Sequence, residues 1–366
     1  MAVSNQAGQS HPDGKGRIAK PAGRLKVLWI REPYLSLILS GRKTVEVRVG
    51  YENIRRLQPG DRLKLNDRHL ATIRRVGRYA DFEELLARED AAAIAPDLEP
   101  DVLLAALREL YPPEKEALGA VALEILPRRY DAVLFDMGHT LVHFDPPETA
   151  VVQMALRDLG FERTADEIGA AVQPVWGAYY RDAATATFAA TPDHDHQTQL
   201  HLMRGLLEQL GIMVDDDLVE ACESTVDSRF SQPGVMRPFP EVGEVLAALQ
   251  EQHYRLGIVS NWSWNLRDRV AQAGLDGFFE TVWASAYAGC NKPHPGIFFQ
   301  ALVQMDLAPE RTLYVGDSYA HDVVGARSAG LDAVLLDRKG SARDPDCDVI
   351  GDLWGLFDLL HDKTLP

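Results

Sequence analysis

The feature that most constrains the fold is a short apolar run that ends in a carboxylate, within residues 130–145. Residues 132–135 (Ala-Val-Leu-Phe) carry no polar side chain, which is typical of a strand buried on both faces of a parallel sheet. Asp136 follows directly, and Gly138 then breaks the pattern. Ligands bind to open α/β sheets at the carboxyl ends of the strands. We therefore expect Asp136 to lie in a site at that edge.

Charge is distributed unevenly along the 366 residues, a length that favours two or more domains. The net charge is −16, yet residues 1–126 carry 20 Lys+Arg against 18 Asp+Glu. Residues 24–80 alone carry 14 basic and 5 acidic residues, a net charge of +9. This local excess indicates a module that binds polyanions. The alternative is a solvated surface on which cations cluster by chance.

The spacing of the cysteines and the length of the apolar runs help to predict the cellular compartment. Cys222, Cys290 and Cys347 are far apart and odd in number, which argues against a disulfide framework or a zinc site and is typical of a cytoplasmic protein. No run of about 18 apolar residues predicts a membrane span. Residues 1–23 lack the apolar core of a signal peptide, and we expect them to form a disordered tail.

Residues 24–127 are expected to form a first domain, a small β-barrel. Alternating and apolar runs predict its strands, and helical periodicity predicts its helices. The expected strands are 25–30, 44–49, 61–65, 69–76 and 120–126, and the expected helices are 33–40, 81–88 and 101–110.

Three segments of this domain resemble the ASCH family, whose fold is a PUA-like barrel. They are residues 41–48 (GRKTVEVR), 59–61 (PGD) and 111–113 (YPP). The resemblance implies that RNA or a nucleotide binds in a cleft beside three charged residues of the first segment. These residues are Lys43, Glu46 and Arg48.

The chemistry of the three charged residues suits that expectation, because Lys43 and Arg48 can make charge-assisted contacts to phosphate. A salt-bridged strand edge is the alternative. Some small members of the family are amidohydrolases with a Lys–Thr–Glu set. In this chain Glu46 stands in the place of the threonine, and Val102 stands in the place of the helix glutamate. These departures favour binding over amide hydrolysis.

Four spaced motifs follow the first domain. Each places polar residues after a predicted strand or in a loop, and each alone has an ordinary structural interpretation as a cap or a surface charge. They are Asp136 with Thr140, the strand 255–260 that ends in Ser260 and is followed by Asn261, Lys292 in the loop 291–295, and Asp317 with Asp322 after the strand 312–316.

Together, from Tyr130 to about Leu360, the motifs resemble the haloacid dehalogenase superfamily of phosphohydrolases. The resemblance implies a doubly wound, mostly parallel Rossmann-like core in which Asp136 accepts a phosphoryl group from a small phosphorylated substrate. Thr140 would hydrogen-bond beside it and hold the loop. Ser260 and Asn261 would contact the phosphoryl oxygens, and Lys292 would neutralise charge.

The same resemblance implies Mg²⁺, because carboxylate and carbonyl oxygens are the ligands that this hard cation prefers. Its ligands would be Asp136, a backbone carbonyl at Gly138, Asp317 and Asp322. The metal would orient the phosphate for in-line attack.

One departure from the superfamily pattern lies two residues after the nucleophile, where phosphatases usually carry a second aspartate as acid and base. Here the position is Gly138, and loss of such a group typically costs about 10²–10⁴-fold in rate. His139, His143 or Asp145 is a candidate replacement. Two alternatives stay open: a metal-independent dehalogenase, and an RNA- or nucleotide-binding protein with a degenerate hydrolase domain.

Residues 128–366 are thus expected to form the hydrolase domain, with its core at 128–146 and 236–366 and a helical cap at 147–235. We expect the cap helices at 148–159, 165–183, 197–210 and 216–230. Residues 179–181 (Tyr-Tyr-Arg) would face either the substrate or solvent. Residues 192–195 read as a loop that contains a helix N-cap, rather than as part of a metal site with His196 and His201.

Overall fold

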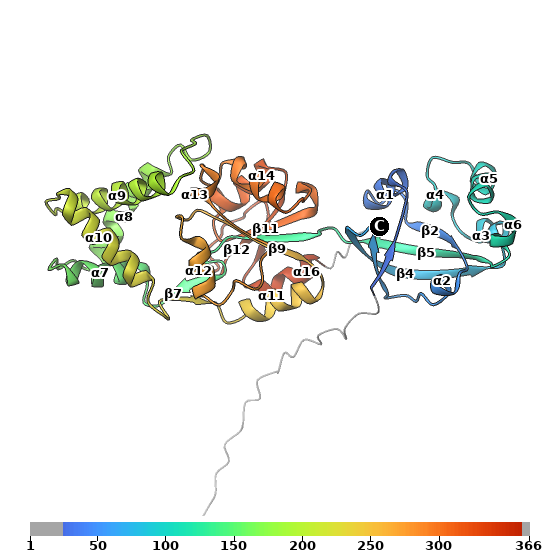
Figure 1. The fold of residues 1–366 in the computed structure, drawn as a ribbon, viewed down its shortest axis with the longest axis horizontal. Helices are drawn as coiled ribbons and strands as arrows, with labels where there is room; N and C mark the ends of the chain where they lie inside the picture. Colours follow the sequence, from blue (N-terminus) through green and yellow to red (C-terminus); the bar gives the residue numbers. More distant parts are fainter. Residues whose placement is uncertain (1–24, 361–366) are drawn as a thin grey trace, which may run out of the picture. The chain divides into compact units, whose positions relative to one another are not determined.

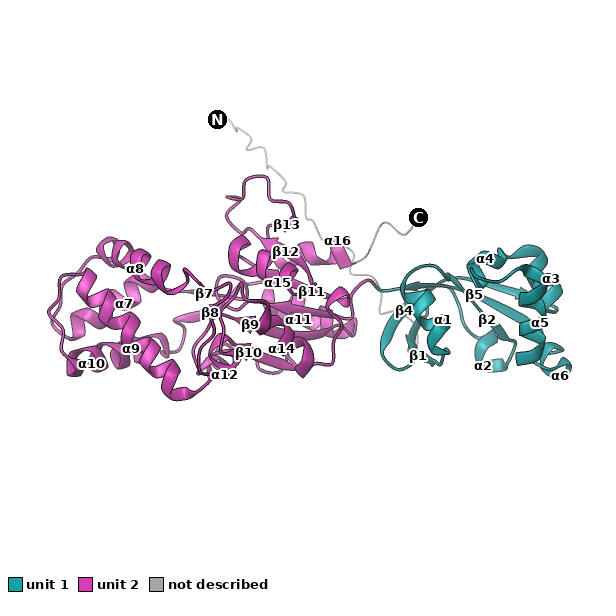
Figure 2. Cartoon of the chain, turned by 90° about the horizontal axis from the view of Figure 1, so that it is seen from above, with its two compact units in different colours: residues 1–128, 365 teal, residues 129–364, 366 magenta. Residues whose placement is uncertain are grey.

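The computed structural model describes residues 25–360, so the expected tail at 1–23 lies outside the described residues. These residues form two compact units that divide between Arg128 and Arg129 (Figure 2). In the described part of the chain, no helix is both long and apolar enough to cross a membrane.

The first unit is built on a five-stranded sheet that curls on itself, with strand order β1-β3-β4-β5-β2. Arg48, on the edge strand β2, donates to the carbonyl of Trp29, directly after the opposite edge strand β1, at 2.6 Å. The two edges of the sheet therefore approach each other. The strands are β1 (Leu25–Leu28), β2 (Val45–Val49), β3 (Arg62–Leu65), β4 (His69–Tyr79) and β5 (Ala120–Pro127).

Both faces of the curled sheet are packed, because alternate side chains of a strand point to opposite faces. On β5, Val121, Leu123 and Ile125 join one apolar cluster, while Ala120 and Ala122 join the other. The helices are α1 (Glu32–Leu39), α2 (Glu52–Arg55), α3 (Phe82–Arg88), α4 (Ala91–Ile94), α5 (Pro100–Leu110) and α6 (Pro113–Glu116). The short helices α2, α4 and α6 were not predicted, because four residues show no helical period.

The positive charge of residues 24–80 is balanced inside this unit. Residues 25–128 carry 17 Lys+Arg and 17 Asp+Glu. Arg42 pairs with Asp97 at 2.6 Å, and Arg75 pairs with Glu89 at 2.6 Å. The local excess that suggested a polyanion-binding module is therefore not a net charge of the unit, since later acidic residues fold back against it.

The second unit contains a six-stranded parallel sheet with helices on both faces (Figure 1). The strand order is β10-β9-β6-β11-β12-β13, so the first strand of this unit, β6, lies in the interior of the sheet between β9 and β11. The strands are β6 (Ala132–Phe135), β9 (Arg255–Ser260), β10 (Thr281–Ala284), β11 (Thr312–Gly316), β12 (Asp332–Leu336) and β13 (Asp348–Ile350). The short strand β13 was not predicted.

Burial on both faces explains the uninterrupted apolar sequence of β6. Val133 and Phe135 pack into one cluster with α11 and α12, whereas Leu134 packs into the other with α14 and α15. Each face of the central strand is thus covered by helices. These helices are α11 (Val242–Glu251), α12 (Leu266–Gln272), α14 (Pro295–Gln304) and α15 (Val324–Ser328), and the short helices α13 (Ser285–Ala288) and α16 (Leu356–Leu360) complete the set.

Four further helices gather beyond one end of this sheet (Figure 1). A two-stranded antiparallel pair, β7 (Val142–Phe144) with β8 (Met236–Pro238), connects them to the core. They enclose their own apolar cluster, which includes Leu156, Ile168 and Leu207. We call these helices the cap. They are α7 (Glu148–Asp158), α8 (Ala165–Tyr179), α9 (Pro192–Gln209) and α10 (Asp216–Phe230).

Two cap boundaries differ from the sequence prediction. Helix α8 ends at Tyr179 rather than at residue 183, because the chain then turns through a bond from Arg181 N to Ala178 O. Helix α9 begins at Pro192, so the prediction of a loop at 192–195 was wrong. Thr191 is its N-cap, accepting from His194 N at 3.2 Å, and Pro192 occupies the first turn, where a missing N–H costs little.

A substitution in β9 tests the packing of the sheet. A Cβ added at Gly257 would lie 2.8 Å from Leu134 Cδ2 and 2.9 Å from Thr281 Cγ2. We expect Gly257→Ala to lower the stability of this unit by about 1–3 kcal/mol through overpacking. In Gly243→Ala, where no atom lies within 4 Å, stability should stay equal or rise slightly. Tryptophan fluorescence during denaturation of the whole chain measures both, and equal stability of the two variants would contradict the packing described.

Candidate active site

Three neighbouring strands deliver polar residues to the same edge of the six-stranded sheet. Asp136 follows β6, Ser260 ends the neighbouring strand β9, and Asp317 follows the other neighbour, β11. Because the strands are parallel, their carboxyl ends meet. The topology therefore brings Asp136 together with residues that lie more than a hundred positions away in the sequence.

One oxygen of Asp136 accepts two hydrogen bonds. Ser260 Oγ donates to Asp136 Oδ1 at 2.8 Å, and Lys292 Nζ donates to the same oxygen at 2.5 Å. Among the described residues, none donates a hydrogen bond to Oδ2. Burial raises the pKa of Asp136, while the positive charge of Lys292 and the two hydrogen bonds act in the opposite direction. The arrangement fixes the carboxylate and leaves one oxygen for a ligand.

Lys292 is almost fully buried, with its ammonium group between two carboxylates. Besides Asp136, it donates to Asp322 Oδ1 at 2.6 Å and to Tyr314 OH at 3.1 Å. Burial alone would lower the pKa of this lysine, but the negative charges of Asp136 and Asp322 outweigh burial and raise it. Lys292 is therefore charged at neutral pH and holds the site together electrostatically.

Asn261 positions the lysine loop. Its Oδ1 accepts from Lys292 N at 2.7 Å, and its Nδ2 donates to Lys292 O at 3.1 Å. Both polar atoms of the amide are thus engaged by the backbone of Lys292. Asn261 thus fastens the lysine loop to the end of β9, a contact that sequence alone does not reveal. The expectation that Asn261 also contacts the substrate stays a prediction.

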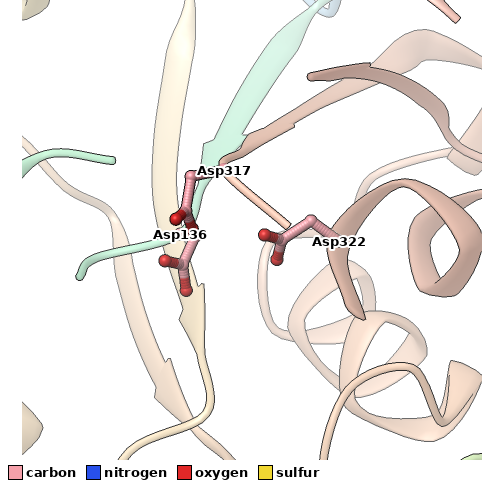
Figure 3. Close-up of side chains that lie close together, drawn as sticks. All are labelled: Asp136, Asp317 and Asp322. Atoms are coloured by element: carbon pink, nitrogen blue, oxygen red, sulfur yellow. The ribbon is translucent and has the colours of Figure 1, made fainter. Parts of the chain in front are cut away.

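Three carboxylates converge at this edge. Oxygens of Asp136, Asp317 and Asp322 lie within 4.8 Å of one another, and Figure 3 shows the carboxylate of Asp322 pointing toward the other two. Asp322 lies on a single π-helical turn (Tyr319–Val323), and its Oδ2 accepts from Ser318 N at 2.9 Å. A cluster of hard oxygen donors of this kind suits a cation such as Mg²⁺.

The electrostatic surroundings of Asp317 are negative. Although the residue as a whole is exposed, desolvation of its carboxyl group, together with the negative charges of Asp136 and Asp322, raises its pKa to about 6. Carboxylates with raised pKa values in one cluster gain from a shared cation. The residues present therefore fit a divalent metal ion. A role for the carbonyl of Gly138, which lies next to this cluster in sequence, stays a prediction.

Thr140 does not make the expected hydrogen bond. Its side chain is fully buried, and its Oγ1 has no hydrogen-bond partner among the described residues. Its carbonyl instead accepts from Arg338 NH2 at 2.8 Å, so the loop is held through the backbone. The contact was not predictable because Arg338 is almost two hundred residues away.

Gly138 stands where an aspartate would act as acid and base, and the three candidate replacements for that aspartate lie in different surroundings. His139 lines a cavity between the cap and the core loops, and its Nε2 lies 2.8 Å from Glu148 Oε1. This hydrogen bond raises the pKa of His139. His143 instead packs against Phe239, with ring centroids 5.0 Å apart, and Asp145 pairs with Arg237 at 3.2 Å.

A cavity of about 540 Å³ opens between the cap and the loops that carry the site. Tyr179 and Tyr180 line it, whereas the neighbouring Arg181 does not and is exposed. His194 also lines it, while His196 lies 3.8 Å from Glu220. The early start of α9 explains the position of His194, in the first turn of that helix.

Sequence reasoning missed Tyr314, which is fully buried beneath the site. Its hydroxyl donates to Val259 O at 2.7 Å and lies 3.1 Å from both Asp322 Oδ1 and Lys292 Nζ. A tyrosine in the middle of an otherwise apolar strand was the available signal, because a buried hydroxyl requires partners.

The three charged residues expected to bind RNA or a nucleotide do lie together in the first unit. Glu46 contacts both cations, with Lys43 Nζ at 3.2 Å and Arg48 at 2.8 Å. Lys43 is buried and also donates to Val45 O at 2.7 Å and Ile94 O at 2.6 Å, so its three N–H groups are all used. Lys43 is therefore an internal anchor here, and a phosphate contact would require it to break these bonds.

With this geometry in place, comparison with known proteins gives the family. The family model of haloacid dehalogenase-like hydrolases matches residues 130–330, and that of the ASCH domain matches residues 28–129. The chain belongs to the haloacid dehalogenase-like hydrolases, and its first unit is an ASCH domain. The doubly wound fold and the ASCH–hydrolase fusion expected from the sequence are confirmed.

Individual relatives match the second unit to different extents. A glyceraldehyde 3-phosphate phosphatase of Methanothermobacter thermautotrophicus is 34% identical over 31% of this chain, which spans only 50% of that relative's length. A phosphoserine phosphatase of Thermus thermophilus is 30% identical over 62% of this chain and 90% of its own length. The crystal structure of the putative HAD-hydrolase YfnB from Bacillus subtilis, bound to magnesium, is 22% identical with a TM-score of 0.53, covering 64% of this chain and all of that one, and it shows the fold alone.

Replacement of the buried lysine tests the electrostatic account. We expect Lys292→Gln to lower the free energy of unfolding by about 3–5 kcal/mol near pH 8 in EDTA, because it leaves buried carboxylates uncompensated. A carboxyl group whose pKa is higher in the folded than in the unfolded state binds more protons when folded. Its contribution to stability therefore falls as the pH rises from the unfolded-state pKa to the folded-state pKa. The loss should therefore be smaller near pH 5.

The control for this measurement is Lys339→Gln, which alters an exposed lysine of the same unit. It should change stability little at either pH. An equal loss for Lys292→Gln at both pH values would contradict the charge network.

Proposed function

We propose that the second unit is a Mg²⁺-dependent phosphomonoester hydrolase that acts through an aspartyl-phosphate on Asp136. The observation that carries the proposal is the site around this carboxylate. Ser260 and Lys292 hold one of its oxygens at 2.8 and 2.5 Å, and the carboxylates of Asp317 and Asp322 lie beside it. The phosphatase names of the two relatives support the same class of reaction.

In the proposed first step, a carboxylate oxygen of Asp136 attacks phosphorus, the bond from phosphorus to the leaving oxygen breaks, and that oxygen takes a proton. In the second, water attacks the same phosphorus, gives up a proton and restores the carboxylate of Asp136. Splitting one displacement into two is the advantage of a covalent intermediate. In this proposal, Ser260 and Lys292 stabilise negative charge on the phosphoryl oxygens.

Mg²⁺ would be held by Asp136, Asp317 and Asp322, with the carbonyl of Gly138 as the further expected ligand. When bound, such an ion neutralises the charge of a phosphate group and fixes its orientation. The acidic cluster also argues against the dehalogenase alternative, since halide displacement has no use for three converging carboxylates.

For the proton that the leaving group needs, we assign His139. Of the three candidates, it is the one that lines the cavity, and its pairing with Glu148 orients the imidazole. His143 and Asp145 are engaged with Phe239 and Arg237 instead. This assignment lets the chain dispense with an aspartate at position 138.

For the ASCH unit we propose RNA or nucleotide binding, as a second candidate function. The side chain of Trp29 is 68% exposed, and Arg48 donates to the carbonyl of the same residue. An exposed aromatic ring suits a stacked base, and a cation bound to the backbone of the same residue suits a nearby phosphate. The three free cysteines support our further proposal of a cytoplasmic protein.

Removal of the nucleophile tests the proposed function. With a panel of small phosphomonoesters and Mg²⁺, Asp136→Asn should lose at least about 10³-fold in kcat, because an amide oxygen is a poor nucleophile. Phosphate release measures the loss, and EDTA should abolish the wild-type activity. Asp276→Asn, at an exposed position of the same unit, is the matched control. Full turnover in Asp136→Asn would exclude the covalent step.

The pH dependence of Mg²⁺ binding is a separate prediction. Because the pKa of Asp317 is raised to about 6, protons compete with the metal below that pH. The apparent affinity for Mg²⁺ should weaken as the pH falls through about 6, by up to about tenfold per pH unit for one displaced proton. Thermal shift by Mg²⁺ at several pH values measures this, and a shift of equal size at pH 5 and pH 8 would refute it.

A further inference from the structure

The cavity beside the nucleophile shows where a leaving group would lie. Gly138 and His139, which follow Asp136, form part of its wall, and so do Asn261 and Asn291, which adjoin Ser260 and Lys292. A phosphate held at Asp136 would therefore direct the rest of its substrate into this space. Its volume of about 540 Å³ falls in the range of pockets that enclose drug-sized ligands, and it exceeds what a short aliphatic leaving group fills.

Aromatic side chains form most of the apolar wall. They come from the cap and from the core loops, so both parts of the unit contribute. Phe188 lies parallel to the ring of His194, at an angle of 19° with centroids 5.3 Å apart. Aromatic faces bind flat rings by stacking and edge contacts. The aromatic lining residues include Phe144, Trp176, Tyr179, Tyr180, Phe188, Phe230 and Trp262.

The charged groups of the wall disfavour a second anion on the substrate. Glu148, Asp195 and Asp227 contribute carboxylates. Arg269 also lines the cavity, but it is buried and occupied, with bonds of 2.5 Å to Asp227 Oδ1 and 2.5 Å to Ser231 Oγ. The cations of the wall are already paired, Arg269 with Asp227 and His139 with Glu148, so a free carboxylate or second phosphate would meet negative charge, whereas amino groups on a ring would find acceptors.

Asp195 is a hydrogen-bond acceptor held in a fixed position at the cavity wall. It projects from the first turn of α9, and one of its oxygens accepts from Trp264 N at 2.8 Å. The contact ties the cap to a core loop and fixes the carboxylate at the cavity wall. A carboxylate fixed in this way recognises a hydrogen-bond donor at a defined place.

We propose that the substrate is a phosphomonoester of an alcohol that bears an aromatic or heteroaromatic ring, of nucleoside size, whose leaving group carries no second anionic group. The inference rests on the proposed function for the phosphate end and on the cavity for the leaving group. Nucleoside monophosphates fit this class, whereas phosphoserine, sugar bisphosphates and nucleoside triphosphates do not.

The kinetic test uses matched substrates with the full chain and Mg²⁺. The value of kcat/KM for nucleoside 5′-monophosphates should exceed that for ribose 5-phosphate by about ten- to hundredfold, the gain expected from stacking one base. Phosphoserine should be poorer still. Trp176→Leu and Phe188→Leu should each reduce this preference, because they lower kcat/KM for the nucleotides more than kcat/KM for ribose 5-phosphate. Trp354→Leu, outside the cavity, should leave the preference unchanged.

A binding test separates the inference from the proposed function. In Asp136→Asn, calorimetry with nucleosides that carry no phosphate should show binding that Trp176→Leu weakens. Hydrolysis of aliphatic and aromatic esters at equal kcat/KM, or a preference for phosphoserine, would overturn the inference and leave the phosphatase standing. Absence of any hydrolysis, with nucleoside binding that depends on Trp176, would overturn the phosphatase and support the cavity assignment. Nucleoside binding that is unchanged in Trp176→Leu would overturn the assignment.

Discussion

The site depends on one buried ion network, in which the ammonium group of Lys292 lies between the carboxylates of Asp136 and Asp322 at 2.5 and 2.6 Å. Without this cation, negative charges from two strand ends and a helical turn would repel one another in a poorly solvated place. Tyr314 supports the network from below, and Asn261 holds the lysine backbone. The parallel sheet supplies the rigid frame, since β9, β6 and β11 end side by side.

The cap encloses the space beside the nucleophile at the edge of the parallel sheet. Several polar contacts join it to the core: Arg269 to Asp227 at 2.5 Å, Trp264 N to Asp195 at 2.8 Å and Phe188 N to Gly289 O at 2.8 Å. The last contact lies three residues before Lys292, so the cap loop and the lysine loop are directly linked. The aromatic residues that we connect with substrate choice are held against the site by these contacts, as expected of an element that closes over a reaction.

The sequence was sufficient to predict the parts of this site that follow from strand order. One such part is Asp136, which directly follows an apolar run, and another is the pair Asp317 and Asp322. The carboxyl ends of parallel strands meet at one edge of the sheet, so residues that follow such strands lie at that edge. Contacts that depend on side-chain direction were not predictable. Thr140 was expected to hydrogen-bond beside Asp136 and does not, and the bonds of Asn261 to the backbone of Lys292 were not foreseen. The start of α9 was misjudged because Thr191, and not a later residue, satisfies its first N–H groups. In the ASCH unit, the grouping of Lys43, Glu46 and Arg48 was apparent from sequence, but the complete burial of the lysine depends on the carbonyl of Ile94, about fifty residues away.

The central claim is that Asp136 becomes covalently phosphorylated, and acid quenching during turnover followed by peptide mass spectrometry tests it most directly. The account predicts a phosphoryl group on the peptide that carries Asp136, formed only with Mg²⁺ and a phosphomonoester present and absent from Asp136→Asn. Sustained phosphate release with that peptide unmodified, or with the phosphoryl group on another residue, would contradict it.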